Sequence, residues 1–60
     1  MTQQPDVMTV AEVARYLRVN QATVYRLIRE EGLPAVKVGN QWRVRRDLLE
    51  AWFDSREEAG

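Results

Sequence analysis

Polar and cationic side chains gather in two stretches of this 60-residue chain. The first stretch carries amide, hydroxyl and guanidinium groups at Asn20, Gln21, Thr23, Tyr25, Arg26 and Arg29, with the small Ala22 among them. The second carries further cations and one amide at Lys37, Asn40, Arg43, Arg45 and Arg46. Such groups donate hydrogen bonds and positive charge. Their chemistry indicates binding to a surface rich in acceptors and negative charge, as in the groove and phosphates of a nucleic acid.

The charges are segregated along the chain, although the formal net charge is zero. Residues 15–46 contain eight Lys and Arg against Glu30 and Glu31, a balance of +6. Residues 1–14 carry −2 and residues 47–60 carry −4. Because salt screens charges beyond roughly 8–10 Å, the middle segment acts locally as a polycation. The pattern favours phosphate binding by the middle segment, weakened by the acidic end.

Several functions are excluded by composition. The chain has no Cys and no His, which excludes disulfides, thiolate zinc sites and imidazole chemistry. Its carboxylates are scattered and a domain this small offers no catalytic cleft, so we expect no enzyme, metal, cofactor or small-molecule ligand. No apolar run approaches the roughly 18 residues that span a bilayer, and the first residues lack a secretion signal. We therefore expect a cytoplasmic protein with no membrane partner.

Two short helices are predicted over residues 9–17 and 20–30. Thr9 and Asn20 are good N-caps, and Glu12 completes a capping box with Thr9. Each helix has one apolar stripe at helical spacing, made of Val10, Val13, Ala14 and Leu17 in the first and Val24, Leu27 and Ile28 in the second. A connection of only a couple of residues forces the helices to cross steeply, so the second helix projects a face outward.

The outward face of the second helix is the predicted binding surface. At about 100° per residue, Ala22, Arg26 and Arg29 point away from the buried stripe, with Thr23 and Tyr25 on its flanks. Gln21 falls in the first turn. A plainer interpretation is that these arginines are solvated charges paired with Glu30 and Glu31.

A β-hairpin and a third helix follow. We expect a three-residue loop over 39–41, because it pairs Val38 with Trp42 and Val36 with Val44 and gives one apolar face. This register places Lys37 opposite Arg43. Like charges that face each other across strands are destabilising, so we expect a phosphate between them. In the last helix we expect an apolar stripe that closes the core, made of Leu48, Leu49, Trp52 and Phe53. Both tryptophans are predicted to be core residues. We expect a flexible arm over 1–7, a domain over 8–54 and a frayed tail over 55–60.

These motifs resemble the excisionase-type, MerR-like helix-turn-helix domains. The resemblance covers about Met8 to Phe53 and is carried by residues 9–17, 23–28, 33–39, 42–44 and 48–53. It implies a mainly α fold with a small β-hairpin, a winged helix-turn-helix in the order α-α-β-β-α. It also implies double-stranded DNA as the partner. Gln21, Ala22, Thr23, Tyr25 and Arg26 would enter the major groove, and the hairpin over 36–45 would be a wing with Lys37 and Arg43 near the backbone.

Two positions depart from the family pattern. Arg18 stands in the turn between the helices where the family usually has Gly, which predicts either a different turn or some strain. Glu30, Glu31 and Gly32 follow the second helix, where the family more often has a basic residue and an earlier Gly. Carboxylates near phosphates are unfavourable, so the edge of the DNA footprint is open at this end.

The expected function is sequence-specific DNA binding, with several alternatives for its biological use. Asn20 and the first backbone amides of the second helix would hold a phosphate. Lys37, Arg43, Arg45 and Arg46 would supply most of the salt-dependent affinity, with Arg15 and Arg18 as further backbone contacts. The chain would act as a small transcriptional regulator or as an excisionase-like recombination directionality factor. The latter would work with an integrase or with a second copy at an adjacent site. A winged helix that binds protein and has lost DNA is the other alternative.

Overall fold

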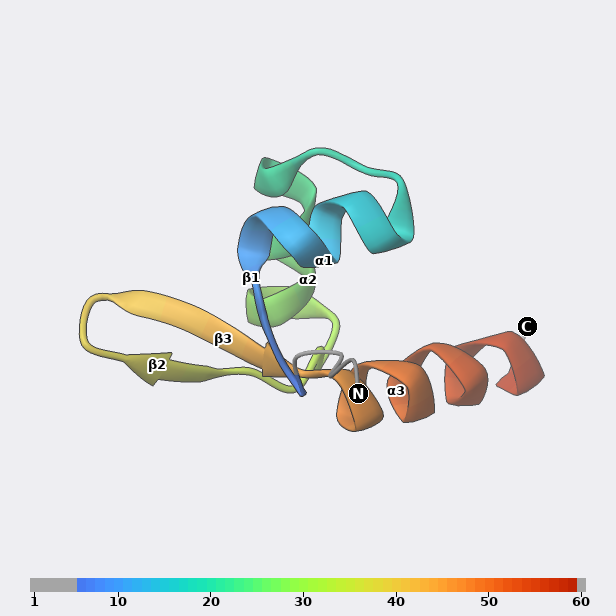
Figure 1. Ribbon diagram of the computed structural model, residues 1–60. Coiled ribbons are helices and arrows are strands. Elements are labelled where there is room, and N and C mark those ends of the chain that lie inside the picture. The colour runs from blue at the N-terminus through green and yellow to red at the C-terminus, as the bar shows by residue number, and fades with distance from the viewer. Residues whose placement is uncertain (1–5, 60) are drawn as a thin grey trace.

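The computed structural model describes residues 6–59, with side chains through Glu57. Three helices and a three-stranded antiparallel sheet make up this part of the chain (Figure 1). In chain order the elements are β1 (Val7–Thr9), α1 (Val10–Leu17), α2 (Gln21–Glu30), β2 (Val36–Val38), β3 (Gln41–Arg45) and α3 (Arg46–Ala59). This architecture confirms the predicted winged helix-turn-helix and adds strand β1 before α1. Within the described range, no helix is both long and apolar enough to cross a membrane.

Four elements meet through one fully buried side chain each. These side chains are Val13 of α1, Val24 of α2, Val44 of β3 and Leu49 of α3. Burying such a side chain stabilises a fold by roughly 1.5–3 kcal/mol. All four belong to apolar patterns that the sequence shows, and together they attach α2 to the sheet.

Side-chain caps begin both α1 and α2. Thr9 Oγ1 accepts a hydrogen bond from the backbone N–H of Glu12, and the Glu12 carboxylate accepts one from the backbone N–H of Thr9. Asn20 Oδ1 accepts from the backbone N–H of Thr23 at 2.8 Å and from its hydroxyl at 3.0 Å. The predicted capping box and the second N-cap are therefore confirmed.

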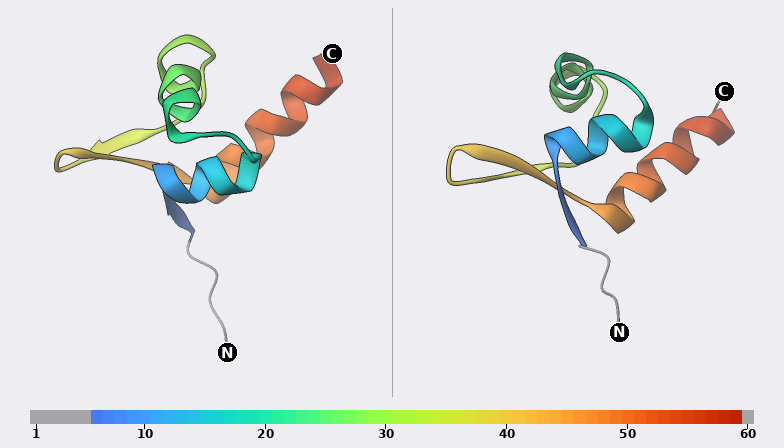
Figure 2. Two further views of the ribbon diagram at one scale, coloured as in Figure 1. Left: turned by 90° about the horizontal axis from the view of Figure 1, so that it is seen from above. Right: turned by 45° about the horizontal axis from the view of Figure 1, so that its top comes forward.

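The turn between α1 and α2 depends on an unusual backbone conformation at Arg18. This residue ends α1 with φ 63° and ψ 44°, and its N–H donates to the carbonyls of Ala14 and Arg15. The next amide, that of Val19, also donates to Ala14 O at 2.9 Å. Three residues then suffice to join the helices, which cross steeply as predicted (Figure 2). Of the two alternatives raised by Arg18, the structure has the strained one, because a residue with a side chain takes the left-handed conformation that Gly adopts at low cost.

The predicted register of the hairpin is wrong. Strands β2 and β3 are joined by a two-residue loop, so Val38 pairs with Gln41, Lys37 with Trp42 and Val36 with Arg43. Gly39 has φ 62°, as the first central position of a two-residue hairpin turn requires. The apolar face of β3 is completed by β1, which places Met8 beside Val44. Val36 and Val38 consequently stay on the exposed face, about 60% accessible each.

The predictions for the chain ends and for α3 also need correction. Val7, expected in an arm, lies in β1, whereas residues 1–5 and 60 lie outside the described residues. Helix α3 follows β3 without a loop and is helical through Ala59, where a frayed tail was expected. Only a narrow stripe along α3 contacts the core, and Leu49 and Trp52 face inward on that stripe. Leu48 and Phe53, both expected to close the core, are 41% and 47% exposed.

A cluster on α3 holds the end of α2. The backbone carbonyl of Glu31, the C-cap of α2, accepts hydrogen bonds from Trp52 Nε1 at 3.2 Å and Arg56 Nη1 at 3.3 Å. The Glu31 carboxylate pairs with Arg56 Nη2 at 2.9 Å, and the Arg56 guanidinium lies 4.9 Å from the centre of the Trp52 ring. We name Glu31, Trp52 and Arg56 the α2–α3 clamp. The clamp turns Glu31 toward α3, and the pair with Arg56 accommodates this acidic residue at the end of α2.

Arg18→Gly should stabilise the protein. A left-handed conformation costs a residue with a side chain roughly 1–2 kcal/mol, and the extra freedom of Gly in the unfolded chain offsets part of that gain. We expect the free energy of unfolding to rise by about 0.5–1 kcal/mol, measured by urea denaturation at unchanged m-value. Arg18→Ala removes the same charge but keeps Cβ, and it should give no such gain. An equal gain from both variants would assign the effect to charge.

Arg56→Ala should weaken the α2–α3 clamp. It removes a half-exposed ion pair and a stacked guanidinium, for which we expect a loss of about 1 kcal/mol in the free energy of unfolding. Hydrogen exchange should rise at the amides of Glu31 and Leu33, which close the end of α2 by donating to Leu27 O. Glu50→Ala is the matched control, because its contact with Arg46 is longer, at 3.9 Å. Equal effects of the two variants would contradict a special role for the clamp.

Candidate nucleic-acid interface

Helix α2 exposes a continuous polar arc. Its buried side is Val24, with Leu27 and Ile28 packed partly against the core, as predicted. The side chains around the rest of the helix are exposed: Gln21, Ala22, Tyr25, Arg26, Arg29 and Glu30. This surface contains most of the residues that the sequence assigned to the second helix.

An open groove separates α2 from the hairpin of β2 and β3, which we call the wing. We name it the helix–wing groove; its volume is about 540 Å³. It is lined by Thr9, Val10, Ala11, Gln21, Tyr25, Lys37, Asn40, Gln41, Trp42 and Arg43. Residues separated by 12 or more positions in the chain, such as Tyr25 and Lys37, thus share one concave surface. Figure 2 shows the wing extending away from the two helices α1 and α2.

Five predicted site residues are brought together there: Gln21, Tyr25, Lys37, Asn40 and Arg43. The other lining residues were not predicted from the sequence as site residues. Trp42 was assigned to the core, and it is partly buried but also forms a wall of the groove. The start of α1 lines the groove because β1 brings Thr9 beside Arg43, and β1 was not predicted.

The wing orients its cations by contacts of its own. Lys37 Nζ lies 5.4 Å from the centre of the Trp42 ring, so the ammonium is held over an aromatic face. Arg43 donates to the carbonyl of Trp42 at 2.9 Å and to Gln41 Oε1 at 2.8 Å. The expected cross-strand pair of Lys37 and Arg43 is wrong, because these residues face different partners in the register. Both nevertheless line the same groove.

The positive charge on this surface is not neutralised by nearby carboxylates. Within residues 6–57, no carboxylate lies within ion-pair distance of Arg26, Arg29 or Lys37. The alternative in which Arg26 and Arg29 pair with Glu30 and Glu31 is not seen among the described residues. The carboxylate of Glu31 is bound by Arg56 instead. The surface formed by α2 and the wing is therefore available to an external anion.

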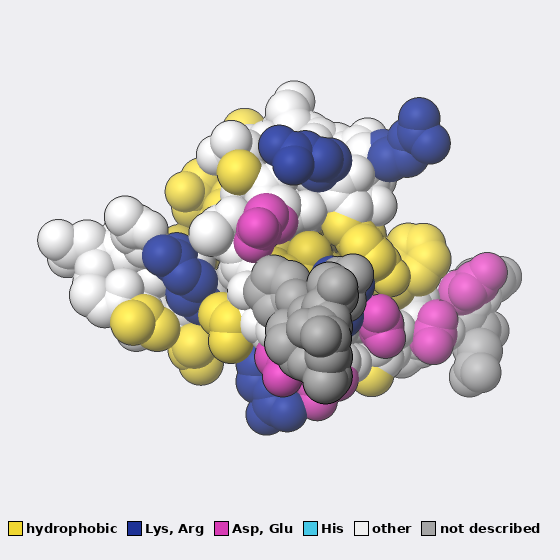
Figure 3. Space-filling model, in the orientation of Figure 1, with side chains coloured by type: hydrophobic (Ala, Val, Ile, Leu, Met, Phe, Trp, Pro, Cys, Tyr) yellow, Lys and Arg dark blue, Asp and Glu magenta, His cyan; other side chains and the backbone are white. Residues whose placement is uncertain are grey.

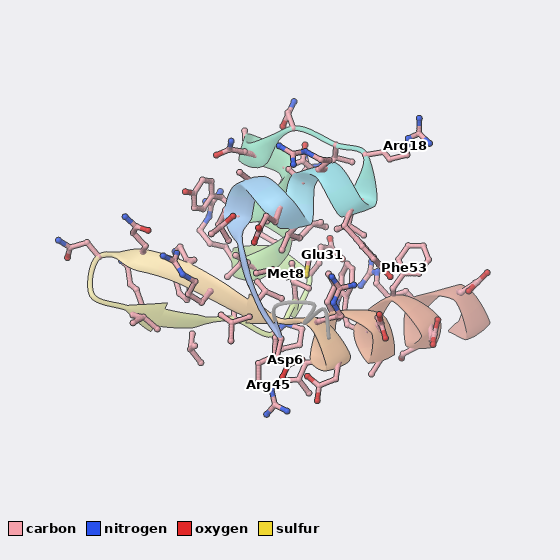
Figure 4. All side chains as sticks on the ribbon, viewed as in Figure 1. Asp6, Met8, Arg18, Glu31, Arg45 and Phe53 are labelled. Carbon is pink, nitrogen blue, oxygen red and sulfur yellow. The ribbon has the colours of Figure 1, made fainter. Side chains whose placement is uncertain are left out.

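Other predicted site residues lie apart from the groove. Thr23 is on the opposite side of α2, about 200° around the helix from Gln21 and Tyr25, and its hydroxyl donates to Asn20. Arg45 points from the underside of the sheet, away from α1 and α2 (Figure 4), and pairs with Asp47 at 2.7 Å.

Five further predicted cations also lie outside the lining of the groove. Arg26 and Arg29 are exposed on α2. Arg46 is half-buried and contacts Glu50. Arg15 and Arg18 are exposed on α1 and at its end, and Arg18 extends away from the wing (Figure 4). The structure thus brings together the wing tip and the first turns of α2, and it leaves the outlying cations elsewhere.

Comparison with known proteins adds an independent observation. The helix-turn-helix domain family matches residues 7–57. Two proteins of Mycobacterium tuberculosis are each 48% identical over 54 residues, covering 82% of this chain and 69% of theirs. They bear the names "Putative DNA-binding protein MT0521", in strain CDC 1551 / Oshkosh, and "Putative DNA-binding protein Rv0500A", in strain H37Rv. No solved structure matches the chain at a significant level. The described fold and this match over most of the sequence agree: the chain belongs to the helix-turn-helix domain family.

Proposed function

We propose that this chain binds double-stranded DNA through α2 and the wing. The observation that carries the proposal is the helix–wing groove, in which Gln21 and Tyr25 of α2 face Lys37 and Asn40 of the wing. A B-DNA major groove, about 12 Å wide, admits one α-helix. With α2 in the major groove, the sugar–phosphate strand at its edge would run between α2 and the wing. The relatives named for DNA binding support the same partner.

Each part of the surface then has a distinct role. Gln21, Ala22, Tyr25, Arg26 and Arg29 would face base edges or the groove walls, with Arg26 reading a guanine. Lys37, Asn40 and Arg43 would bind phosphates, and the side-chain amide of Asn20 would reach a phosphate at the start of α2. Arg45 and Arg46 contact carboxylates of α3, so we assign them a smaller share of the affinity. Arg15 and Arg18 would touch the backbone only if the DNA extends past α1.

The biological use of DNA binding divides into two cases. A small transcriptional regulator would protect an isolated or palindromic site. An excisionase-like directionality factor would protect tandem sites through a second copy at an adjacent site, and it would contact an integrase. Footprinting on the natural target separates the two. A module that binds only protein is the remaining alternative, and absence of binding to random duplex DNA at low salt would favour it.

Arg26→Ala should relax sequence preference. A bidentate arginine–guanine contact contributes roughly 1–3 kcal/mol of discrimination. The measurement is the affinity for a duplex selected from a randomised library, compared with the same duplex carrying each single substitution. We expect the penalty at one guanine to shrink by about 1–3 kcal/mol while penalties elsewhere stay the same. An unchanged penalty at every position would remove Arg26 from base recognition.

Lys37→Ala should weaken binding to all sequences about equally. Loss of one phosphate contact lowers the slope of log affinity against log salt by about one. Fluorescence anisotropy with selected and scrambled duplexes at several salt concentrations measures both effects. Arg45→Ala is the matched control, since that guanidinium lies outside the groove and pairs with Asp47. If Arg45→Ala reduced the slope as much as Lys37→Ala, the wing would contact DNA through its other face.

A further inference from the structure

A second groove, apolar in character, lies between α3 and the paired helices α1 and α2. Its volume is about 430 Å³, and we name it the apolar groove. It is lined by Leu17, Val19, Thr23, Leu27, Trp52, Phe53, Arg56 and Glu57. The proposed DNA surface does not use it. Glu31 and Phe53 are seen between the upper helices and α3 in Figure 4.

The side chains at the mouth of the apolar groove are not needed to complete the core. Phe53 is 47% exposed and Val19 is 38% exposed, whereas the core is closed by Leu49 and Trp52. Large apolar side chains gathered around an open depression on a small domain mark a site for another molecule. An aromatic such as Phe53 supplies the anchoring contact in sites of this kind.

One border of the apolar groove is acidic. Glu57 lines the groove, and Asp54 is exposed three positions before it on α3, outside the lining. No cation of the described residues lies within ion-pair distance of either carboxylate. Arg56, the cation that lines the groove, is bound to Glu31 in the α2–α3 clamp. Figure 3 shows acidic side chains along α3 beneath a group of hydrophobic ones. This border repels phosphates and attracts cations.

We propose that the apolar groove binds a short amphipathic helix of a partner protein. Its apolar side chains insert between Leu27 and Phe53, and Lys or Arg residues along one edge of that helix face Asp54 and Glu57. Three helices already form the walls of the groove, and a helix laid into such a site buries one apolar face with anchors at helical spacing. The charge of α3 selects a basic edge over an acidic one.

Occupation of the apolar groove is compatible with DNA binding. Leu27 and Thr23 lie on the side of α2 that is turned away from Gln21 and Tyr25, which line the helix–wing groove. A partner seated against α3 therefore leaves the polar arc of α2 uncovered. The inference goes beyond the proposed function and does not depend on it, because its test contains no DNA.

The test uses a designed fluorescent peptide as the probe. The peptide forms an amphipathic helix of about five turns, with Leu at one-face spacing and Lys at the flanking positions. A second peptide carries Glu in place of Lys. Fluorescence anisotropy should show saturable one-to-one binding of the Lys peptide and at least about tenfold weaker binding of the Glu peptide.

Variants locate the binding site. Phe53→Asp should lower affinity for the Lys peptide by about tenfold or more, while Val36→Asp, an exposed valine on the wing, should leave it unchanged. Val19→Asp serves as the second groove variant if Phe53→Asp fails to fold by circular dichroism. Asp54→Lys with Glu57→Lys should reverse the preference between the two peptides.

Three results would overturn the proposal. The first is absence of saturable binding by the Lys peptide. The second is equal binding of the Lys and Glu peptides, or binding that is unaffected by both Phe53→Asp and Val19→Asp. The third is a concentration-dependent dimer in sedimentation velocity that Phe53→Asp abolishes, since the groove would then be filled by a second copy of this chain.

Discussion

The three-residue connection between α1 and α2 is the constraint on which the rest of the structure depends. Arg18 takes a left-handed conformation, which reverses the chain within one turn and brings Asn20 into position to cap α2. Without this turn the two helices could not cross steeply, and α2 could not have one side in the core, at Val24, and the other exposed. At its far end, α2 is held by Trp52 and Arg56 of α3. The exposed helix is thus fixed at both ends by contacts that leave its polar arc clear.

Segregation of charge follows from the same geometry. The wing cations Lys37 and Arg43 border one groove, and Glu57 of α3 borders another. Several carboxylates that would otherwise oppose DNA are bound within the protein, as in the pairs of Glu31 with Arg56 and Asp47 with Arg45. A net charge of zero is therefore compatible with two surfaces of opposite sign, because the field at each surface is local. The two proposed partners, DNA and a basic helix, correspond to these two surfaces.

Helix caps and apolar periodicity in the sequence predict the elements that depend on interactions between neighbouring residues. The positions of α1 and α2 can be predicted because caps and apolar periodicity act within a few residues. The caps are Thr9 with Glu12 for α1 and Asn20 for α2. Alternation of apolar residues predicts the wrong hairpin register for two reasons. Gly39 favours a two-residue turn, and Met8 of the unpredicted β1 completes the apolar face instead of Val36. Strand β1 is three residues long and has no periodicity of its own to reveal it. The contact between Trp52 and Glu31 spans 21 positions, and no local pattern reports it.

An NMR titration of the isotopically labelled protein with duplex DNA tests most directly whether α2 and the wing act as one DNA-binding surface. We expect the amide signals of Gln21, Tyr25 and Arg26 to shift together with those of Lys37 and Asn40, with one common affinity, while those of Asp54 and Glu57 stay in place. Shifts confined to only one of the two elements, or centred on the acidic edge of α3, would contradict this expectation.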